Sequence, residues 1–260
     1  MPSISISGRT YFYEDRGEGE PLLLLHGFPF SSQGYWPQLE APPKGVRLIV
    51  PDHRGFGQSA PGEGVATMDA MADDALTLLD ALKLPSAFIG GLSMGGYVAI
   101  ALTRMDPGRV RGLLLIDTQS LPDDEAGKAR REATAVDVEQ HGVGGLVDGM
   151  LPRLMAAGVD PTVKARVERL MRAQSPQAVA AASRGMALRT DGKDILSRFA
   201  GPCTIVVGAE DVITPVEKAK VMHELVGGST LEVIAGAGHL TNLERPAEFG
   251  ALVERFTAGR

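Results

Sequence analysis

The strongest constraint on the fold of this chain is a series of short, almost continuous apolar runs separated by longer stretches with helical periodicity. The runs lie at Leu22–Leu25, Val46–Val50, Ala87–Ile89, Leu113–Ile116, Thr204–Val207 and Leu231–Ile234. Strands that are buried on both faces have this composition, and they occur in parallel sheets covered by helices. The alternation of strand and helix therefore predicts an α/β fold with a doubly wound, mostly parallel central sheet.

An antiparallel hairpin is expected at one edge of this sheet. Ile4–Ser7 and Thr10–Glu14 have the length of short strands, and Gly8 between them can make the turn. Two helix starts follow later in the chain. Pro246 occupies the first position of an apolar helical stripe, and Thr214–Glu217 has the form of a capping box with proline at its second residue.

The alternation stops between residues 120 and 189, where no convincing strand occurs. Helices are expected at Lys128–His141 and Gly144–Leu151, the second ended by Pro152. Two more should begin at Asp160-Pro161 and Ser175-Pro176, where an N-cap residue precedes a proline. We therefore expect a core formed by residues 1–119 and 190–260 and a helical cap, or lid, formed by residues 120–189.

Composition excludes several classes of function. The 260 residues carry a net charge of −6, which argues against a nucleic-acid partner because such partners select basic surfaces. One cysteine, Cys203, allows neither an intramolecular disulfide nor a cysteine-rich zinc site. The N-terminus lacks the pattern of a signal peptide, and the apolar runs are too short to cross a bilayer. We therefore expect a cytoplasmic protein without a membrane partner, a metal or a cofactor.

The strongest local motif is Gly91-Leu92-Ser93-Met94-Gly95, which matches G-x-S-x-G. It follows an apolar run and precedes a helical stretch, which is the strand–turn–helix context of a nucleophile elbow. Glycines at 91 and 95 would let the strand and the helix approach closely, and the helix N-terminus would place backbone N–H groups beside the serine. Ser93 is the predicted nucleophile.

A serine nucleophile needs a base, and His239 is the predicted one. His239 lies in a glycine-rich loop directly after the apolar run Leu231–Ile234. Of the other histidines, His223 falls inside an amphipathic helix and His141 at the end of a cap helix, where surface or capping roles are expected.

The acid that orients the base should also follow a strand. Asp211 lies in the loop after Thr204–Val207, and its neighbour Glu210 stays open as an alternative. The order Ser93, Asp211, His239 is the order in which an α/β-hydrolase triad occurs along its chain.

The oxyanion hole is expected from two backbone N–H groups, those of Phe28 and Met94. Phe28 lies in the segment His26-Gly27-Phe28-Pro29, which directly follows the strand Leu22–Leu25, and Met94 follows the nucleophile. His26 precedes the loop glycine, so we expect it to hold the loop by hydrogen bonds and not to act in catalysis.

Five segments in this order resemble the α/β-hydrolase superfamily over essentially the full chain. They are Leu22–Pro29, Asp52–Ser59, Gly91–Gly96, Gly208–Asp211 and Gly236–His239. Within that superfamily the chain looks most like small bacterial carboxylesterases and 3-oxoadipate enol-lactonase-like hydrolases. The resemblance implies that Asp52–Ser59 is a structural turn, with Asp52 and His53 not binding metal. It also implies a helical cap after the sixth strand.

The resulting hypothesis is a serine hydrolase that cleaves small carboxylic esters or lactones through an acyl-enzyme. Serine at position 93 disfavours haloalkane dehalogenases and epoxide hydrolases, which resemble this chain but have aspartate there. Two alternatives use the same residues: a cofactor-free haloperoxidase or perhydrolase, and a C–C hydrolase. A third is a binding protein that senses a small molecule on this fold.

The substrate pocket is expected to be mainly apolar. Aromatic residues are absent between residues 98 and 198, so the cap should contribute aliphatic walls and the core aromatic ones. We expect Trp36, Leu154 and Met186 to line the pocket. The apolar cap residues expected to face inward are Leu146, Met150, Leu151, Leu154, Met155, Leu170, Met171 and Met186. Three arginines are possible partners of a substrate carboxylate, although a solvated helix face is the simpler role for each: Arg153, Arg184 and Arg189.

Overall fold

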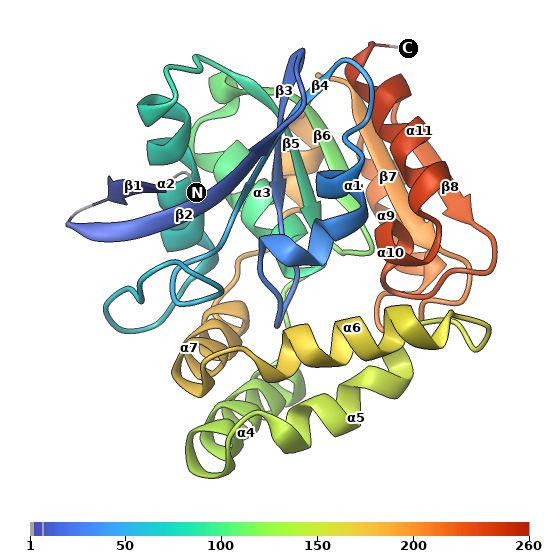
Figure 1. Ribbon diagram of the computed structural model, residues 1–260. Helices are drawn as coiled ribbons and strands as arrows, with labels where there is room; N and C mark the ends of the chain where they lie inside the picture. The colour runs from blue at the N-terminus through green and yellow to red at the C-terminus, as the bar shows by residue number, and fades with distance from the viewer. Residues whose placement is uncertain (1–2, 7, 260) are drawn as a thin grey trace.

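A computed structural model describes residues 3–6 and 8–259. The described residues form an eight-stranded sheet in the order β1-β2-β4-β3-β5-β6-β7-β8 (Figure 1). The strands are β1 (Ser3–Ile6), β2 (Arg9–Arg16), β3 (Glu20–Leu25), β4 (Val46–Pro51), β5 (Ala87–Leu92), β6 (Val110–Ile116), β7 (Cys203–Gly208) and β8 (Thr230–Ile234). β2 is antiparallel to β1 and β4, and the other neighbours are parallel. The predicted parallel sheet and edge hairpin are confirmed, except that Ser7 lies outside the described residues.

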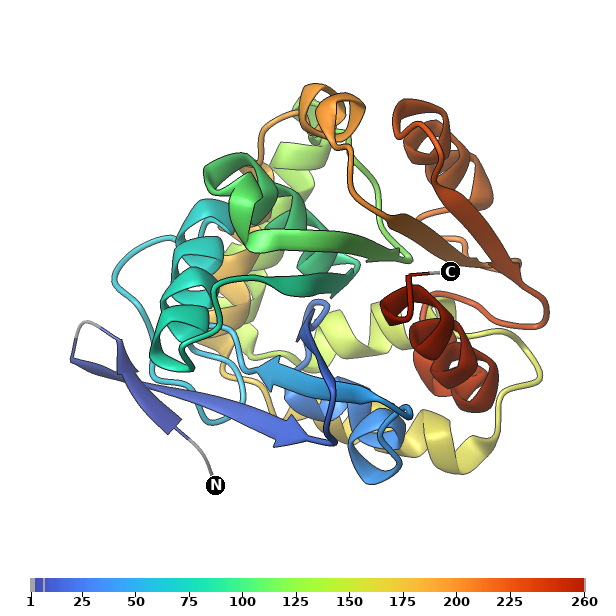
Figure 2. The same cartoon turned by 90° about the horizontal axis from the view of Figure 1, so that it is seen from above.

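Helices cover both faces of this sheet. They are α1 (Trp36–Glu40), α2 (Met68–Ala81), α3 (Met94–Met105), α4 (Glu125–His141), α5 (Gly144–Leu154), α6 (Pro161–Arg172), α7 (Pro176–Ala187), α8 (Lys193–Arg198), α9 (Val216–Leu225), α10 (Thr241–Glu244) and α11 (Pro246–Thr257). Figure 2 shows α2, α3, α8 and α9 along one face and α1 and α11 on the other. Leu22–Leu25 of β3 are fully buried between these layers, which explains their unbroken apolar run.

Helices α4–α7 follow β6 and lie beyond one end of the sheet (Figure 1). α6 and α7 begin where the sequence predicts, since the Asp160 carboxylate accepts the N–H of Thr162 and the Ser175 hydroxyl accepts that of Ala178. α5, in contrast, runs past Pro152 to Leu154. A proline this near the end of a helix removes a single intrahelical hydrogen bond, and the complete burial of Leu154 offsets that loss.

Among the described residues, no helix has both the length and the apolar character needed to span a bilayer.

Candidate active site

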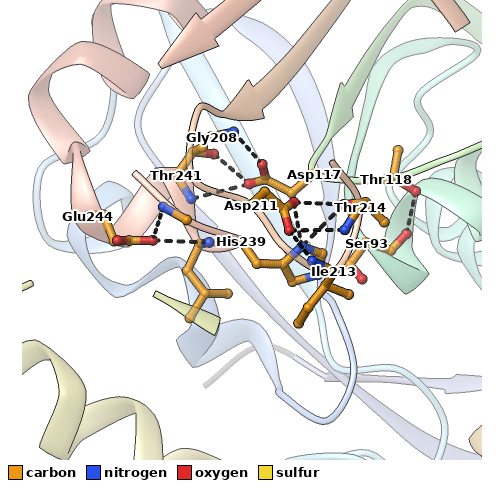
Figure 3. Close-up of polar contacts among 12 residues, drawn as sticks. Ser93, Asp117, Thr118, Gly208, Asp211, Ile213, Thr214, His239, Thr241 and Glu244 are labelled. Carbon is orange, nitrogen blue, oxygen red and sulfur yellow. Dashed lines mark hydrogen bonds and ion pairs between the residues drawn. The ribbon is translucent and has the colours of Figure 1, made fainter. Parts of the chain in front are cut away.

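Ser93 occupies the sharp turn between β5 and α3. Its φ of +52° is unusual for a residue with a side chain, and such strain persists only where surrounding contacts enforce it. Two hydrogen bonds do so here. The N–H of Ser93 donates to the carbonyl of Ile116 at 2.8 Å, and the hydroxyl of Thr118 donates to the Ser93 carbonyl at 2.7 Å (Figure 3).

The two glycines of the motif allow this turn to form. A Cβ on Gly91 would lie closer than 3.0 Å to the carbonyl of Gly95, and a Cβ on Gly95 closer than 3.0 Å to the carbonyl of Leu25 in β3. Both obstacles are backbone atoms, which cannot rotate away as a side chain can. The backbone of α3 therefore packs directly against the backbone of β5 and β3 at this turn, as the G-x-S-x-G pattern predicts.

Replacing Gly95 by alanine should lower the free energy of unfolding by more than about 4 kcal/mol, because β3 must move away from α3. Urea unfolding followed by circular dichroism measures this loss, and failure to obtain folded protein is its extreme form. The control is Gly149→Ala in α5, where an added Cβ meets no atom within 4 Å. That change should raise stability by about 0.5–1 kcal/mol, because alanine is the better helix former. Equal stabilities of the two variants would contradict this steric account.

His239 and Asp211 form a buried hydrogen-bonded pair. His239 lies in the loop after β8, Asp211 in the loop after β7, and Nδ1 of the imidazole is 2.7 Å from Oδ2 of the carboxylate (Figure 3). The neighbouring Glu210 is exposed, so Asp211 is the residue that pairs with the histidine. Because Nδ1–H donates to the carboxylate, Nε2 keeps its lone pair and can accept a proton.

The surroundings of the pair hold Asp211 ionised. Burial alone would raise the pKa of the Asp211 carboxyl, but the hydrogen bond and charge of His239 and the hydrogen bonds from Thr214 bring it below its ordinary value. Oδ1 accepts the N–H groups of Ile213 and Thr214 at 2.7 and 2.9 Å. Burial alone would lower the pKa of His239, yet the hydrogen bond and charge of Asp211 outweigh it and the pKa is raised.

Thr214 corrects one expectation from the sequence. Its hydroxyl does not cap α9, which begins at Val216 after Pro215 without a side-chain cap. Instead it donates to Oδ2 of Asp211 at 2.7 Å and lies 3.2 Å from Nδ1 of His239. The capping-box pattern is present, but the hydroxyl is oriented towards the buried carboxylate three residues upstream, to which it donates a charge-assisted hydrogen bond.

A second buried carboxylate, Asp117, connects the two loops that carry Asp211 and His239. It follows β6 with a φ of +44°, accepts the N–H of Gly208 on Oδ1, and accepts the N–H and hydroxyl of Thr241 on Oδ2 (Figure 3). Burial raises the pKa of Asp117 to about 7, with His239 lowering it and Asp211 raising it further. Asp117 is absent from the residues predicted from the sequence, although it lies directly after a buried strand, as Asp211 and His239 do.

Glu244 joins the His239 loop to the end of α5. One carboxylate oxygen accepts the N–H groups of Gly238 and Leu240, and the other accepts the N–H of Ala156 at 2.8 Å. The N–H of His239 donates to the carbonyl of Leu154 at 2.8 Å. The backbone on both sides of the histidine is therefore bound to the chain that leaves the cap helix.

The predicted oxyanion loop is held by His26, as expected. Its Nδ1 donates to the carbonyl of Gly27 at 2.8 Å and its Nε2 accepts the N–H of His53 at 3.0 Å. Burial lowers the pKa of His26 to about 4, so the ring stays neutral and keeps these roles. No hydrogen bond between described residues uses the N–H of Phe28 or Met94. Both groups are therefore available to a ligand.

Asp52 stabilises a turn, which is the structural role that the resemblance implies. Its carboxylate accepts the N–H groups of Ser32 and Gln58 at 2.6 and 2.8 Å and so closes the turn after β4. Among the described residues, no group of three or more histidine, cysteine, aspartate or glutamate side chains is arranged to hold a metal ion.

A cavity of about 340 Å³ connects the catalytic candidates with the cap. It is lined by Phe28, Ser93, Tyr97, Asp123, Gly127, Arg130, Arg131, Thr134, Leu146, Met150, Arg153, Met186, Ile213 and His239. The aromatic rings of this lining, Phe28 and Tyr97, come from the core, and most of its aliphatic side chains come from the cap, with Ile213 from the core as the exception. Met186 is one of the three lining residues from the apolar part of the cap.

Trp36 and Leu154 lie outside the described lining of this cavity. The Trp36 ring packs under the guanidinium of Arg166, 4.5 Å from its centre. Leu154 is completely buried, and its carbonyl accepts the N–H of His239. Trp36 follows the oxyanion loop closely in sequence, but this closeness does not place it in the cavity lining. The intervening 3-10 turn (Ser32–Tyr35) directs α1 towards α10 and α11.

The cavity is more highly charged than the sequence suggested. Arg153 lines it, whereas Arg184 pairs with Glu132 and Glu139 on the surface and Arg189 pairs with Asp123. Arg130 and Arg131 of α4 line it as well, and sequence analysis missed both. The signal was the spacing of residues 127, 130, 131 and 134, which places them on one helix face.

Known proteins share this architecture. The model of the alpha/beta hydrolase family matches residues 22–252. The AB hydrolase superfamily protein YisY of Bacillus subtilis is 30% identical over 95% of each chain. The 3-oxoadipate enol-lactonase 1 of Acinetobacter baylyi is 29% identical over 93% of this chain and 91% of its own. A thermophilic esterase from Thermogutta terrifontis, solved with malate bound, superposes with a TM-score of 0.94 and 37% identity over 98% of this chain and 96% of its own.

Proposed function

The chain belongs to the alpha/beta hydrolase family, and we propose that it hydrolyses carboxylic esters or lactones through an acyl-enzyme on Ser93. The observation that carries the proposal is the His239–Asp211 pair, whose histidine lines the same cavity as Ser93. Acyl transfer requires a nucleophilic hydroxyl, a base with a free nitrogen and an ionised partner for that base. Ser93, His239 and Asp211 would supply these three groups.

The proposed reaction proceeds in two halves. His239 takes the proton of Ser93 as its oxygen attacks the substrate carbonyl, and the N–H groups of Phe28 and Met94 stabilise the oxyanion. The imidazolium, stabilised by Asp211, then gives its proton to the leaving alkoxide. In the second half His239 deprotonates a water molecule that cleaves the acyl-enzyme, and Ser93 regains its proton.

Relatives support the ester or lactone bond as the target. An enol-lactonase and an esterase are among the proteins that resemble this chain over nearly its whole length. Both names describe the attack of a nucleophile on an acyl carbon with loss of an oxygen leaving group. Ser93 as the nucleophile and His239 as the base are suited to this attack on an acyl carbon.

The test is a panel of p-nitrophenyl esters of increasing chain length together with simple lactones. A fluorophosphonate probe, which reacts with activated serines, is added in parallel. We expect turnover of at least one class and a single covalent adduct on Ser93 by peptide mass spectrometry. Turnover with an adduct on another residue, or no turnover and no adduct, would refute the proposal.

The pH dependence follows from the state of His239, which must be neutral to act as the base. Since its pKa is raised above the ordinary value of 6.5, kcat/KM should decline about tenfold per pH unit in acid, with a midpoint above 6.5. Initial rates on a neutral ester from pH 5 to 9 measure this. A flat profile between pH 5 and 8, with chemistry rate-limiting, would exclude His239 as the base.

A further inference from the structure

We propose that the substrate carries a free carboxylate in addition to the bond that is cleaved, and that Arg130 and Arg153 bind it. The inference rests on the proposed function and narrows its substrate class to acidic esters or lactones. It starts from the charges of the cavity, which is lined by three arginines and a single aspartate besides Ser93 and His239.

The aspartate is already engaged by other partners. Asp123 forms ion pairs with Arg131 at 3.1 Å and with Arg189 at 2.7 Å, and these two guanidinium groups lower the pKa of its carboxyl below the ordinary value against the effect of burial. Arg131 and Asp123 therefore neutralise each other within the cavity wall. The positive charges of Arg130 and Arg153 are then left without a counter-charge in the cavity wall.

Within the described part of the chain, neither the Arg130 nor the Arg153 guanidinium has an ion pair or hydrogen bond. Other cap arginines show that acidic partners are common in this segment. Those with ion pairs are Arg131, Arg166, Arg172, Arg184 and Arg189. Arg169 of α6 likewise has no ion pair or side-chain hydrogen bond among the described residues, and both Arg130 and Arg153 are exposed. Arg130 and Arg153 differ from Arg169 because they line the cavity that also contains Ser93 and His239.

Their placement suits an anion attached to an ester. Arg130 comes from α4 and Arg153 from α5, two packed helices of the cap, whereas Ser93 and His239 come from the core. A guanidinium presents N–H donors in a planar fork that matches a carboxylate. An acyl carbon at Ser93 and a carboxylate at the cap would thus occupy different walls of one cavity.

The space between these walls suits a short carbon chain. Leu146, Met150 and Met186 line the cavity from the cap, and Phe28 and Tyr97 line it from the core. Methylene groups would contact these apolar side chains while the carboxylate contacts the two arginines. A positive cavity wall also raises the local concentration of an anionic substrate, an effect that added salt weakens.

The test compares pairs of methyl esters that differ only in the terminal group. Monomethyl succinate, glutarate and adipate are set against methyl butyrate, valerate and hexanoate, with acid release followed in a pH-stat. We expect kcat/KM to favour the acid member of at least one pair by about tenfold or more at low salt, and less at about 0.5 M NaCl. Equal kcat/KM within all three pairs would overturn the inference.

Substitutions of the two arginines test whether they cause the preference for the acid ester. Arg130→Gln and Arg153→Gln should each reduce the ratio of kcat/KM for the acid ester to that for the neutral ester by about tenfold. Lys128→Gln is the matched control, because Lys128 lies on α4 outside the cavity lining and pairs with Glu125. A preference that survives both arginine variants, or that Lys128→Gln removes equally, would refute the assignment.

Binding provides a readout that does not depend on hydrolysis. Calorimetric titration of the wild-type protein with glutarate should give binding that both arginine variants weaken, and glutaramide, which lacks the charges, should bind less well. If no ester is cleaved but glutarate binds in this manner, the proposed hydrolysis fails and the carboxylate site stands. If esters are cleaved without acid preference and glutarate does not bind, the site fails and the proposed function stands.

Discussion

Ser93→Ala is expected to lower kcat for the best ester of the panel by about 10⁵-fold, because no acyl-enzyme can form without the hydroxyl. Alanine keeps the Cβ at the strained turn, and the hydrogen bonds that hold the turn use only the backbone of Ser93. The fold should therefore be unchanged. The KM should change far less than kcat, since the hydroxyl contributes mainly to the transition state.

The matched control for this variant is Ser197→Ala in α8, whose hydroxyl donates only to the carbonyl of Asp194 on the surface. Its kcat should equal that of the wild type. Stopped-flow measurements with p-nitrophenyl esters give the second readout, because a burst of p-nitrophenol from accumulated acyl-enzyme should be absent in Ser93→Ala. Retention of more than about a tenth of the activity would remove Ser93 from the mechanism.

Asp211→Asn is expected to lower kcat by about 10⁴-fold. The neutral amide cannot stabilise the imidazolium that forms on His239, and its N–H₂ group can turn the ring to the wrong tautomer. The raised pKa of His239 depends on the hydrogen bond and charge of Asp211. The acid limb of the residual activity should therefore move to lower pH.

Glu210→Gln is the control for the acid, because Glu210 is the adjacent carboxylate and its side chain is exposed. We expect its kcat and its pH profile to match those of the wild type. A larger loss in Glu210→Gln than in Asp211→Asn would mean that the orienting acid is Glu210. Both variants need only steady-state kinetics between pH 5 and 9.

The features that could be predicted from the sequence are those encoded by short segments. An apolar run such as Leu22–Leu25 indicates burial directly, and the G-x-S-x-G turn contains both the glycines that its geometry requires and the proposed nucleophile within five positions. Asp211 and His239 could be selected because each directly follows a buried strand. In parallel sheets such loops meet at one edge.

Contacts between distant segments could not be predicted in this manner. Asp117 and Thr241 are 124 residues apart in sequence, and nothing near either residue indicates that they share a hydrogen bond. The local pattern at Thr214 fits a helix cap equally well, so its hydrogen bond to Asp211 cannot be predicted from the sequence. Arg130 lies on a helix with many charged residues, so its direction depends on how α4 packs against α7.

The hydrogen bonds around Glu244 couple the position of the cap to that of His239, the proposed base. Leu154 and Ala156, at the end of α5, are bonded to the backbone of His239 and to the Glu244 carboxylate that holds Gly238 and Leu240. Any opening that displaces this end of α5 must break these bonds or pull the imidazole out of register with Ser93. A movement of the cap that leaves His239 in place must therefore keep this end of α5 fixed.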